Sequence, residues 1–128
     1  MESGNSKKKD KMQASAKYIM EYDFYGAFLT KRQQEVVELY HEENYTLAEI
    51  GDEFGISRQG VHDALKNAEA QLDSYEAKLG LVSRFEKTRN GIDKIDKLID
   101  ELVIENKDNE ELTKKLKKVK SITDELSE

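Results

Sequence analysis

Four polar side chains at helical spacing could contact the bases of a nucleic acid. Arg58, Gln59, His62 and Lys66 fall on one side of a helix that begins after Ser57. An arginine can form two hydrogen bonds with guanine and a glutamine two with adenine, and each such pair contributes about 1–3 kcal/mol of discrimination. The N–H groups at the start of a helix can also hold a phosphate. We therefore predict a DNA-binding surface made of these five residues.

Two predicted helices joined by a tight turn position this surface. Thr46 and Glu49 have the spacing of a capping box at the start of the first helix. Gly55 can supply the left-handed residue that ends this helix, and Ser57 can cap the next. The apolar residues expected in a shared core are Leu47, Ile50, Phe54, Ile56, Val61, Ala64, Leu65 and Ala68. The layout is typical of a helix-turn-helix, whose second helix contacts base edges while the first crosses the DNA backbone.

Helix is also expected before this motif, because the chain has no proline and is rich in good helix formers. A first helix is predicted at about 14–28. Its apolar stripe comprises Tyr18, Tyr22, Tyr25 and Leu29. Tyrosine rings, including that of Tyr40, could stack on bases. Packing in the core or in a dimer interface is the favoured interpretation, because Phe24 and Phe28 lie beside the stripe.

A second helix is predicted to begin after Thr30, since Gln33 completes another capping box. Its inward side chains are expected to be Val36, Val37, Leu39 and Tyr40. The next five residues, 41–45, are interpreted as a polar, solvated link to the helix-turn-helix.

Neither histidine of the chain predicts an enzyme. His41 and His62 have no Ser or Cys nucleophile at an interpretable spacing. The run from His41 to Glu43 could recruit a metal ion, but no second histidine lies three or four residues away. The sequence also has no Gly-rich phosphate loop. We therefore predict no catalytic site, no metal site and no cofactor.

The C-terminal part, residues 84–128, is expected to be a helical extension that packs or dimerises. Ile92, Ile95, Ile99 and Leu102 follow a heptad pattern, which resumes out of phase with Leu112, Leu116, Val119 and Ile122. The interruption at 106–109 predicts a helical hairpin, with a coiled-coil tail as the alternative. Its apolar stripe needs a partner, either the N-terminal bundle or a second copy of the chain.

Composition sets the remaining expectations. Residues 1–12 are lysine-rich and are predicted to form a disordered basic tail, followed by a helix-turn-helix domain at 13–83. The lysines are not followed by an apolar segment, so no secretory signal is expected. No apolar run approaches the roughly 20 residues that cross a bilayer. The absence of cysteine agrees with a reducing cytosol, so a cytoplasmic location is expected.

Charge argues against the nucleic-acid interpretation. The chain has a formal charge of −6, and residues 23–83 hold twelve acidic and five basic residues, a net charge of −7. Affinity for nucleic acid depends largely on Lys and Arg neutralising phosphates, and such a basic footprint is missing here. Asp63, beside His62, would repel phosphate unless it accepts a hydrogen bond from a cytosine amine.

Two segments carry a resemblance to known proteins. The stretch from Leu29 to Leu72, with LTKRQQEVVEL and TLAEIGDEFGIS, resembles region 4 of bacterial sigma factors. The wider stretch from Tyr22 to Phe85, with EYDFYGAFLTKRQQEVVELYHEENYTLAEI, SRQGVHD and LDSYEAKLGL, resembles the YlxM-like family of small bacterial helix-turn-helix proteins. The fold class expected is therefore all-α: a sigma region 4-like helix-turn-helix bundle followed by the helical extension.

The resemblance also implies partners. Proteins of the YlxM-like family often pair as homodimers, and their genes tend to lie beside those of the signal recognition particle GTPase and its receptor. The chain departs from sigma factors because it has no promoter-melting domain. Gly60, His62 and Asp63 also stand where a sigma recognition helix is usually more basic. Both departures weaken any transfer of promoter recognition.

Two functions of different classes therefore remain open. In the first, the chain is a helix-turn-helix DNA-binding regulator, and the resemblance implies a role in the signal recognition particle pathway. In the second, it is an accessory that does not bind DNA. Its acidic helical surface would then bind the signal recognition particle GTPase or its RNA, and opposite charge would speed encounter with a basic partner.

Overall fold

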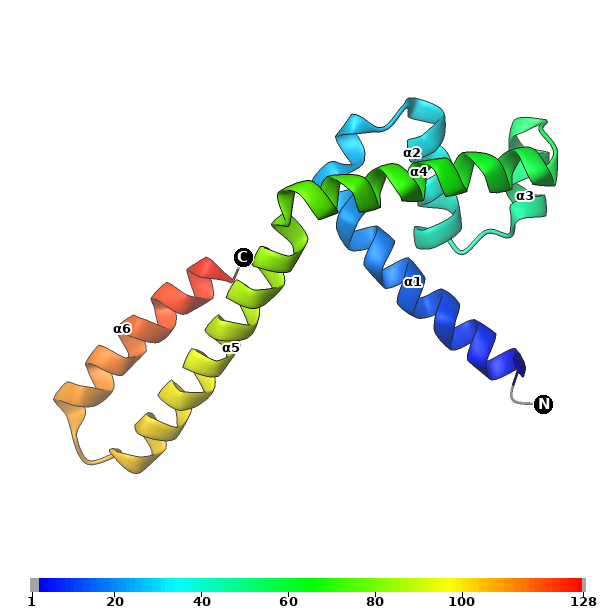
Figure 1. Cartoon of the computed structure of the whole chain (residues 1–128). Coiled ribbons are helices and arrows are strands. Elements are labelled where there is room, and N and C mark those ends of the chain that lie inside the picture. Colours follow the sequence, from blue (N-terminus) through cyan, green and yellow to red (C-terminus); the bar gives the residue numbers. More distant parts are fainter. Residues whose placement is uncertain (1–2, 128) are drawn as a thin grey trace. The chain divides into compact units, whose positions relative to one another are not determined.

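The computed structural model describes the backbone of residues 3–127 and the side chains from Asp10 to Ser127. Its elements are α1 (Ser3–Tyr25), η1 (Gly26–Phe28), α2 (Lys31–Val37), η2 (Glu38–Glu42), α3 (Leu47–Phe54), α4 (Arg58–Leu79), α5 (Leu81–Glu105) and α6 (Glu110–Leu126) (Figure 1). Every regular element in this described range is helical, which confirms the all-α prediction. The chain forms two compact units, one ending at Val82 and the other beginning at Ser83.

The predicted capping boxes begin α2 and α3. The Thr46 hydroxyl accepts a hydrogen bond from the Glu49 N–H at 3.1 Å, and the Glu49 carboxylate accepts one from the Thr46 N–H at 3.0 Å. These hydrogen bonds lower the pKa of the Glu49 carboxyl. Thr30 and Gln33 form the same reciprocal pair at α2. Both helix starts were therefore correctly predicted from a local sequence signal.

Replacing Thr46 with alanine is expected to lower the free energy of unfolding by about 1 kcal/mol, because the N–H of Glu49 loses its acceptor. Urea unfolding followed by circular dichroism measures this change. Ser74→Ala on the exposed side of α4 is the matched control, and it should be neutral or slightly stabilising. Equal destabilisation by the two substitutions would contradict the capping role.

The turn between α3 and α4 also has the predicted form. Gly55 ends α3 in the left-handed region with φ 68°, where glycine has no steric penalty. Ser57 then caps α4, and its hydroxyl accepts a hydrogen bond from the Gly60 N–H at 3.0 Å. Gly80, at φ 62°, ends α4 in the same way. The motif is therefore a helix-turn-helix.

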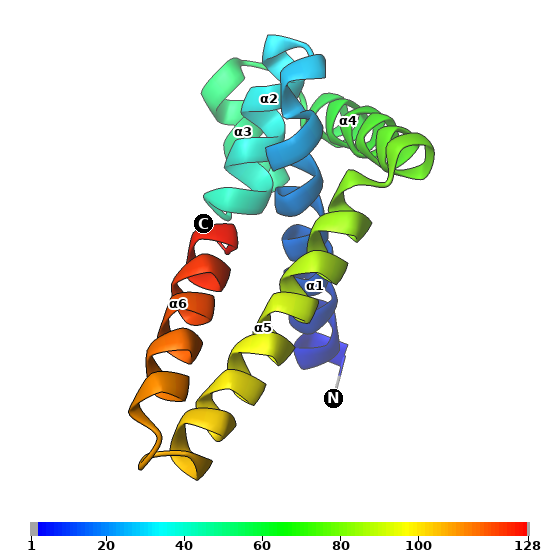
Figure 2. The ribbon, with the colours of Figure 1, turned by 90° about the vertical axis from the view of Figure 1, so that its left-hand side faces the viewer.

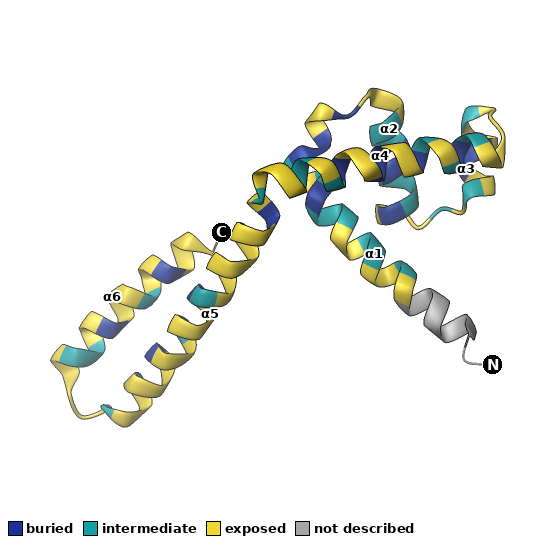
Figure 3. Cartoon of the chain, viewed as in Figure 1, coloured by how far each residue is buried: buried dark blue, intermediate teal, exposed yellow. Residues whose placement is uncertain are grey.

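The core of the first unit lies where α4 packs against α1, α2 and α3. Its buried apolar residues are Tyr25, Leu29, Val36, Val37, Ile50, Val61, Leu65, Ala68, Leu72 and Val82 (Figure 3). One predicted core residue was wrong: Ile56 is 36% exposed. It lies in the turn between Gly55 and Ser57, so it belongs to the inward face of neither helix.

Helix α1 begins at Ser3, earlier than the expected start near residue 14. The predicted disorder of residues 1–12 stays a prediction, because no side chain before Asp10 is described. The tyrosines of α1 pack against the core, as predicted, and each hydroxyl donates to a carboxylate. The donor and acceptor pairs are Tyr18 with Asp73, Tyr22 with Glu38, and Tyr25 with Glu76.

The second unit is the predicted helical hairpin. In two perpendicular views α5 and α6 run antiparallel, side by side (Figures 1 and 2). Asn109 caps α6 by accepting a hydrogen bond from the Leu112 N–H at 3.1 Å. Ile92, Ile99 and Leu116 are buried between the helices. Other apolar side chains of the hairpin are exposed: Ile95, Leu98, Leu102, Val119, Ile122 and Leu126.

Candidate nucleic-acid interface

The start of α4 presents hydrogen-bond donors to solvent. Ser57 has the extended backbone of a helix cap, and its hydroxyl satisfies the Gly60 N–H. The N–H groups of Arg58 and Gln59 have no acceptor within the described residues. Together with the helix dipole, these N–H groups give the end of α4 a partial positive charge that suits a phosphate.

All five predicted contact residues lie on the exposed side of the first half of α4 and its cap. Ser57, Arg58, Gln59 and Lys66 are exposed, and the side chain of His62 retains 45% of its accessible surface. Val61 and Leu65 occupy the opposite, buried side. Helical spacing therefore separates a polar surface from a core-facing surface along the same element.

A local interaction occupies one of these side chains. The Gln59 amide donates to the Asp63 carboxylate at 2.9 Å, one helical turn away. His62 Nδ1 lies 3.5 Å from the same oxygen. Asp63 thus holds Gln59 against the helix, so Gln59 must leave this acceptor, or share its second N–H, before it can read adenine. The four-residue spacing of Gln59 and Asp63 is a sequence signal for this contact, whereas the sequence interpretation placed Asp63 only against phosphate or a cytosine amine.

Exposed acids lie next to this surface. The first helix of a helix-turn-helix crosses the DNA backbone, and in this chain that helix is α3. Its Glu49, Asp52 and Glu53 are exposed. On α4, Lys66 Nζ lies 3.4 Å from the carboxylate of the buried Glu69. Exposed acids that would repel phosphate therefore lie both on α3 and, at Asp63, on α4 itself.

Part of the negative charge counted in the sequence lies inside the protein. Of the twelve acids counted, Glu69 is buried, and Asp73 and Glu76 are half-buried. These acids accept hydrogen bonds or ion pairs from neighbouring helices, for example Asp73 from Tyr18 at 2.9 Å and from Lys17 at 3.0 Å. The net charge of −7 therefore overstates the acidity of the exposed surface.

His41 corrects the prediction of a solvated link. It is 6% exposed and lies in the π-helical turn η2, where the Glu43 N–H donates to the Glu38 carbonyl. Its Nδ1 is 2.8 Å from Ser15 Oγ, and its Nε2 is 2.7 Å from the Glu69 carboxylate. Helix α2, which holds Val36 and Val37, continues directly into η2 and places the His41 ring inside the bundle. The sequence interpretation had ended this helix at Tyr40.

Ser15, His41 and Glu69 share the order of groups found in hydrolytic triads, which the sequence interpretation did not foresee. Such triads also need free N–H groups that stabilise an oxyanion. Ser15 lies inside α1, where backbone N–H groups are committed to the helix. The Nε2–H tautomer satisfies both contacts of the ring, so we interpret the trio as a buried network that joins α1, η2 and α4.

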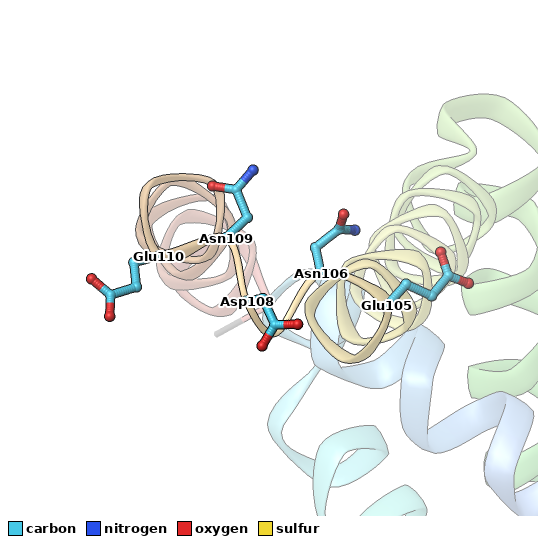
Figure 4. A pocket seen from close by; sticks show the side chains of 5 residues that line it. All are labelled: Glu105, Asn106, Asp108, Asn109 and Glu110. Carbon is cyan, nitrogen blue, oxygen red and sulfur yellow. The ribbon is translucent and has the colours of Figure 1, made fainter.

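The turn of the hairpin does not converge on a ligand. Glu105, Asn106, Asp108, Asn109 and Glu110 surround a hollow there, but their side chains point in different directions (Figure 4). Across the described residues, no three His, Asp or Glu side chains are grouped so that they could hold a metal ion. The same residues include no helix that is both long and apolar enough to cross a membrane.

Comparisons with known proteins agree with this geometry. A family model described as "Putative helix-turn-helix protein, YlxM / p13 like" matches residues 12–128. A UPF0122 protein of Thermoanaerobacter sp. strain X514 is 44% identical over 106 residues, which cover 83% of this chain and 90% of the relative. The UPF0122 protein of Acetivibrio thermocellus is 43% identical over the same coverage of both chains.

A third relative matches over a shorter stretch. The UPF0122 protein of Caldanaerobacter subterraneus subsp. tengcongensis is 51% identical over 78 residues, 61% of this chain and 67% of the relative. The family match spans both the helix-turn-helix and the hairpin, so both units are part of the family's architecture. The chain has a capped two-helix motif with an exposed polar face on its second helix, and the family model and the relatives match most of its length. It therefore belongs to the UPF0122 family of YlxM/p13-like helix-turn-helix proteins.

Proposed function

We propose that the protein is a DNA-binding regulator whose α4 lies in the major groove of a duplex. One observation carries this proposal: the first half of α4 gathers Arg58, Gln59, His62 and Lys66 on an exposed side. Arg58 contacts guanine, Gln59 contacts adenine after release from Asp63, and the start of the helix holds a phosphate. Transcription regulation in the bacterial cytoplasm is the corresponding role.

The exposed acids on α3 reduce the affinity for DNA that we expect of a single copy of the chain. Glu49, Asp52 and Glu53 lower affinity for phosphate regardless of sequence, so one copy of the chain should bind random duplex weakly. Pairing of two copies compensates, because linked half-sites raise the effective concentration of the second contact. The exposed apolar residues of the hairpin support homodimerisation through α5 and α6.

Alanine at Arg58 tests the proposal. Against the duplex preferred by the wild-type protein, we expect affinity to fall about tenfold or more, with relaxed preference at one base position. Fluorescence anisotropy with selected and scrambled duplexes measures both effects. Arg84→Ala is the control, because this exposed arginine lies on α5 and should leave preference unchanged. An Arg58→Ala protein that matches the control would contradict base contact by α4.

A second function is favoured by the exposed acids of α3. That surface suits a basic protein partner, and the family resemblance points to the signal recognition particle GTPase, with the particle's RNA as an alternative ligand of the polar face of α4. Co-purification of the particle that is lost when Asp52 and Glu53 are changed to lysine would favour this function. Co-purification unaffected by the charge change would count against it.

A further inference from the structure

The middle of α6 is strongly basic, and the proposed function does not use it. Residues 112–122 contain five lysines and no acidic residue. One of them, Lys120, pairs with Asp100 of α5. The others are exposed, and none of them forms an ion pair with a described carboxylate: Lys114, Lys115, Lys117 and Lys118. These four residues, the lysine face, therefore keep their ammonium groups free for a partner.

Three members of the lysine face lie on one side of α6. Lys114 and Lys118 are one helical turn apart and Lys117 lies beside them, because residues three and four apart are neighbours on a helix. The buried Leu116 and Thr123 lie on the opposite side, which packs against α5. The three ammonium groups are therefore presented together, away from the core of the hairpin.

This grouping of charge is unfavourable for the hairpin alone. Like charges one turn apart on a helix repel each other, and Lys114 and Lys118 are such a pair. On α5 the charges alternate instead: Lys97 has Asp93 one turn before it and Glu101 one turn after it. A bound polyanion would offset the repulsion on α6, so charge favours an anionic partner for this face.

Acidic residues limit the lysine face at both ends. Glu110 and Glu111 stand in the first turn of α6, and Glu110 lines an open hollow with Lys114 and Lys117, which weakens anion contacts at that end. Acidic residues return at Asp124. The segment between these acids spans about 15 Å, and one strand of a duplex carries about four phosphates over this length. The lysine face can therefore contact several phosphates without meeting an acid.

From this arrangement we infer that the lysine face binds the phosphate backbone of a nucleic-acid duplex. A lysine ammonium recognises phosphate as a point charge, and the phosphates of a strand repeat along a line, as these lysines do. Pairing of two copies would cover the neighbouring Val119 and Ile122, which leaves a bilayer no apolar anchor beside the lysines.

The inference goes beyond the proposed function, in which α4 reads bases, and rests on it only for the identity of the ligand. The exposed acids of α3 leave the first unit without a basic footprint, although affinity for DNA depends largely on such contacts. The lysine face supplies these contacts from the second unit. Its contribution is independent of sequence, because phosphates carry no information about the bases.

Removing three charges from the lysine face tests the inference in the full chain. The variant is Lys114→Gln, Lys117→Gln, Lys118→Gln, since glutamine keeps the helix propensity of lysine. The matched control carries the same change at three exposed lysines of α5: Lys87, Lys94 and Lys97. Fluorescence anisotropy with a scrambled duplex measures affinity at several salt concentrations.

We expect the α6 variant to bind the scrambled duplex about tenfold more weakly or worse in low salt. The slope of log affinity against log salt should shrink by about three, one for each lost phosphate contact. The α5 control should change both quantities much less. Equal weakening by the two variants would overturn the inference, because it would reflect net charge alone. Equally tight, lysine-dependent binding of polyglutamate or of phosphatidylserine vesicles would also overturn it, since the partner would then be any polyanion.

Failure of this inference and failure of the proposed function give different results. Duplex binding that depends on the α6 lysines but shows no sequence preference would keep the inference and remove base reading by α4. A sequence preference that depends on Arg58, with a salt dependence unchanged in the α6 variant, would keep base reading and overturn the inference.

Discussion

Substituting alanine for Gly51 is expected to lower the free energy of unfolding of the first unit by about 3 kcal/mol. A Cβ atom on Gly51 would lie 2.7 Å from the carbonyl oxygen of Ile56, closer than real side chains approach. That oxygen belongs to the backbone of the turn, and the Ile56 N–H donates to the Gly51 carbonyl at 3.0 Å. The clash cannot be relieved by rotating a side chain, so the turn before Ser57 must move.

Urea unfolding followed by circular dichroism measures this loss, and duplex affinity should fall with it, because Ser57 and α4 follow the displaced turn. Gly91→Ala in α5 is the matched control, because no atom beyond its two chain neighbours and the adjacent helix backbone lies within 4 Å of the added Cβ. The control should gain up to about 1 kcal/mol, as a glycine in a helix interior usually does when replaced by alanine. A Gly51→Ala protein as stable as wild type would contradict the tight contact between helix and turn.

Replacing Glu21 with glutamine is expected to stabilise the protein above neutral pH and to have little effect in mild acid. Glu21 is 3% exposed, and its Oε1 has no hydrogen-bond partner within the described residues. Burial, reinforced by the hydrogen bond and charge of Asp73, raises the pKa of the Glu21 carboxyl to about 7. Burial also opposes ionisation of Asp73, but hydrogen bonds from Lys17, Tyr18 and Glu21 outweigh it and lower the Asp73 pKa.

The direction of this pH dependence follows from the proton that Glu21 binds in the folded chain. Between the ordinary glutamate pKa of 4.5 and the raised value of about 7, the folded chain holds a proton that the unfolded chain has lost. The contribution of Glu21 is therefore complete below pH 4.5 and is lost as pH rises through about 7. Glutamine imitates the protonated acid at every pH, so the variant should exceed wild type by about 2–3 kcal/mol in mildly alkaline buffer.

Urea unfolding of both proteins across this pH range isolates the contribution of Glu21 as the difference between two curves. The exposed Glu86 on α5 supplies the control, since Glu86→Gln should give curves parallel to those of wild type. Parallel curves for Glu21→Gln, or a larger gain in acid than in base, would contradict a protonated carboxyl between α1 and α4.

Local signals account for the parts of the fold that the sequence predicted correctly. Thr46, Gly55 and Ser57 act through backbone groups no more than four residues away, so their residue types and spacing suffice. The hairpin turn was predictable for the same reason, because its asparagines interrupt a regular apolar repeat.

The contacts that the sequence did not predict are hydrogen bonds between residues far apart in the chain. His41 is buried only because Ser15 and Glu69, 26 and 28 residues away, supply its partners. The tyrosine–carboxylate contact between Tyr25 and Glu76 spans 51 residues. No repeat or motif relates such pairs along the chain, so the sequence presented these carboxylates as surface charge. The exposed side of α4 was predicted because helical spacing alone separates it from the core.

Mapping backbone amide shifts on addition of a selected duplex shows whether the exposed side of the first half of α4 contacts DNA. We expect the largest shifts at Arg58, Gln59, His62 and Lys66. A scrambled duplex should produce smaller shifts that disappear first as salt is raised. Shifts centred on the hairpin, or the same response to both duplexes, would contradict base reading by α4.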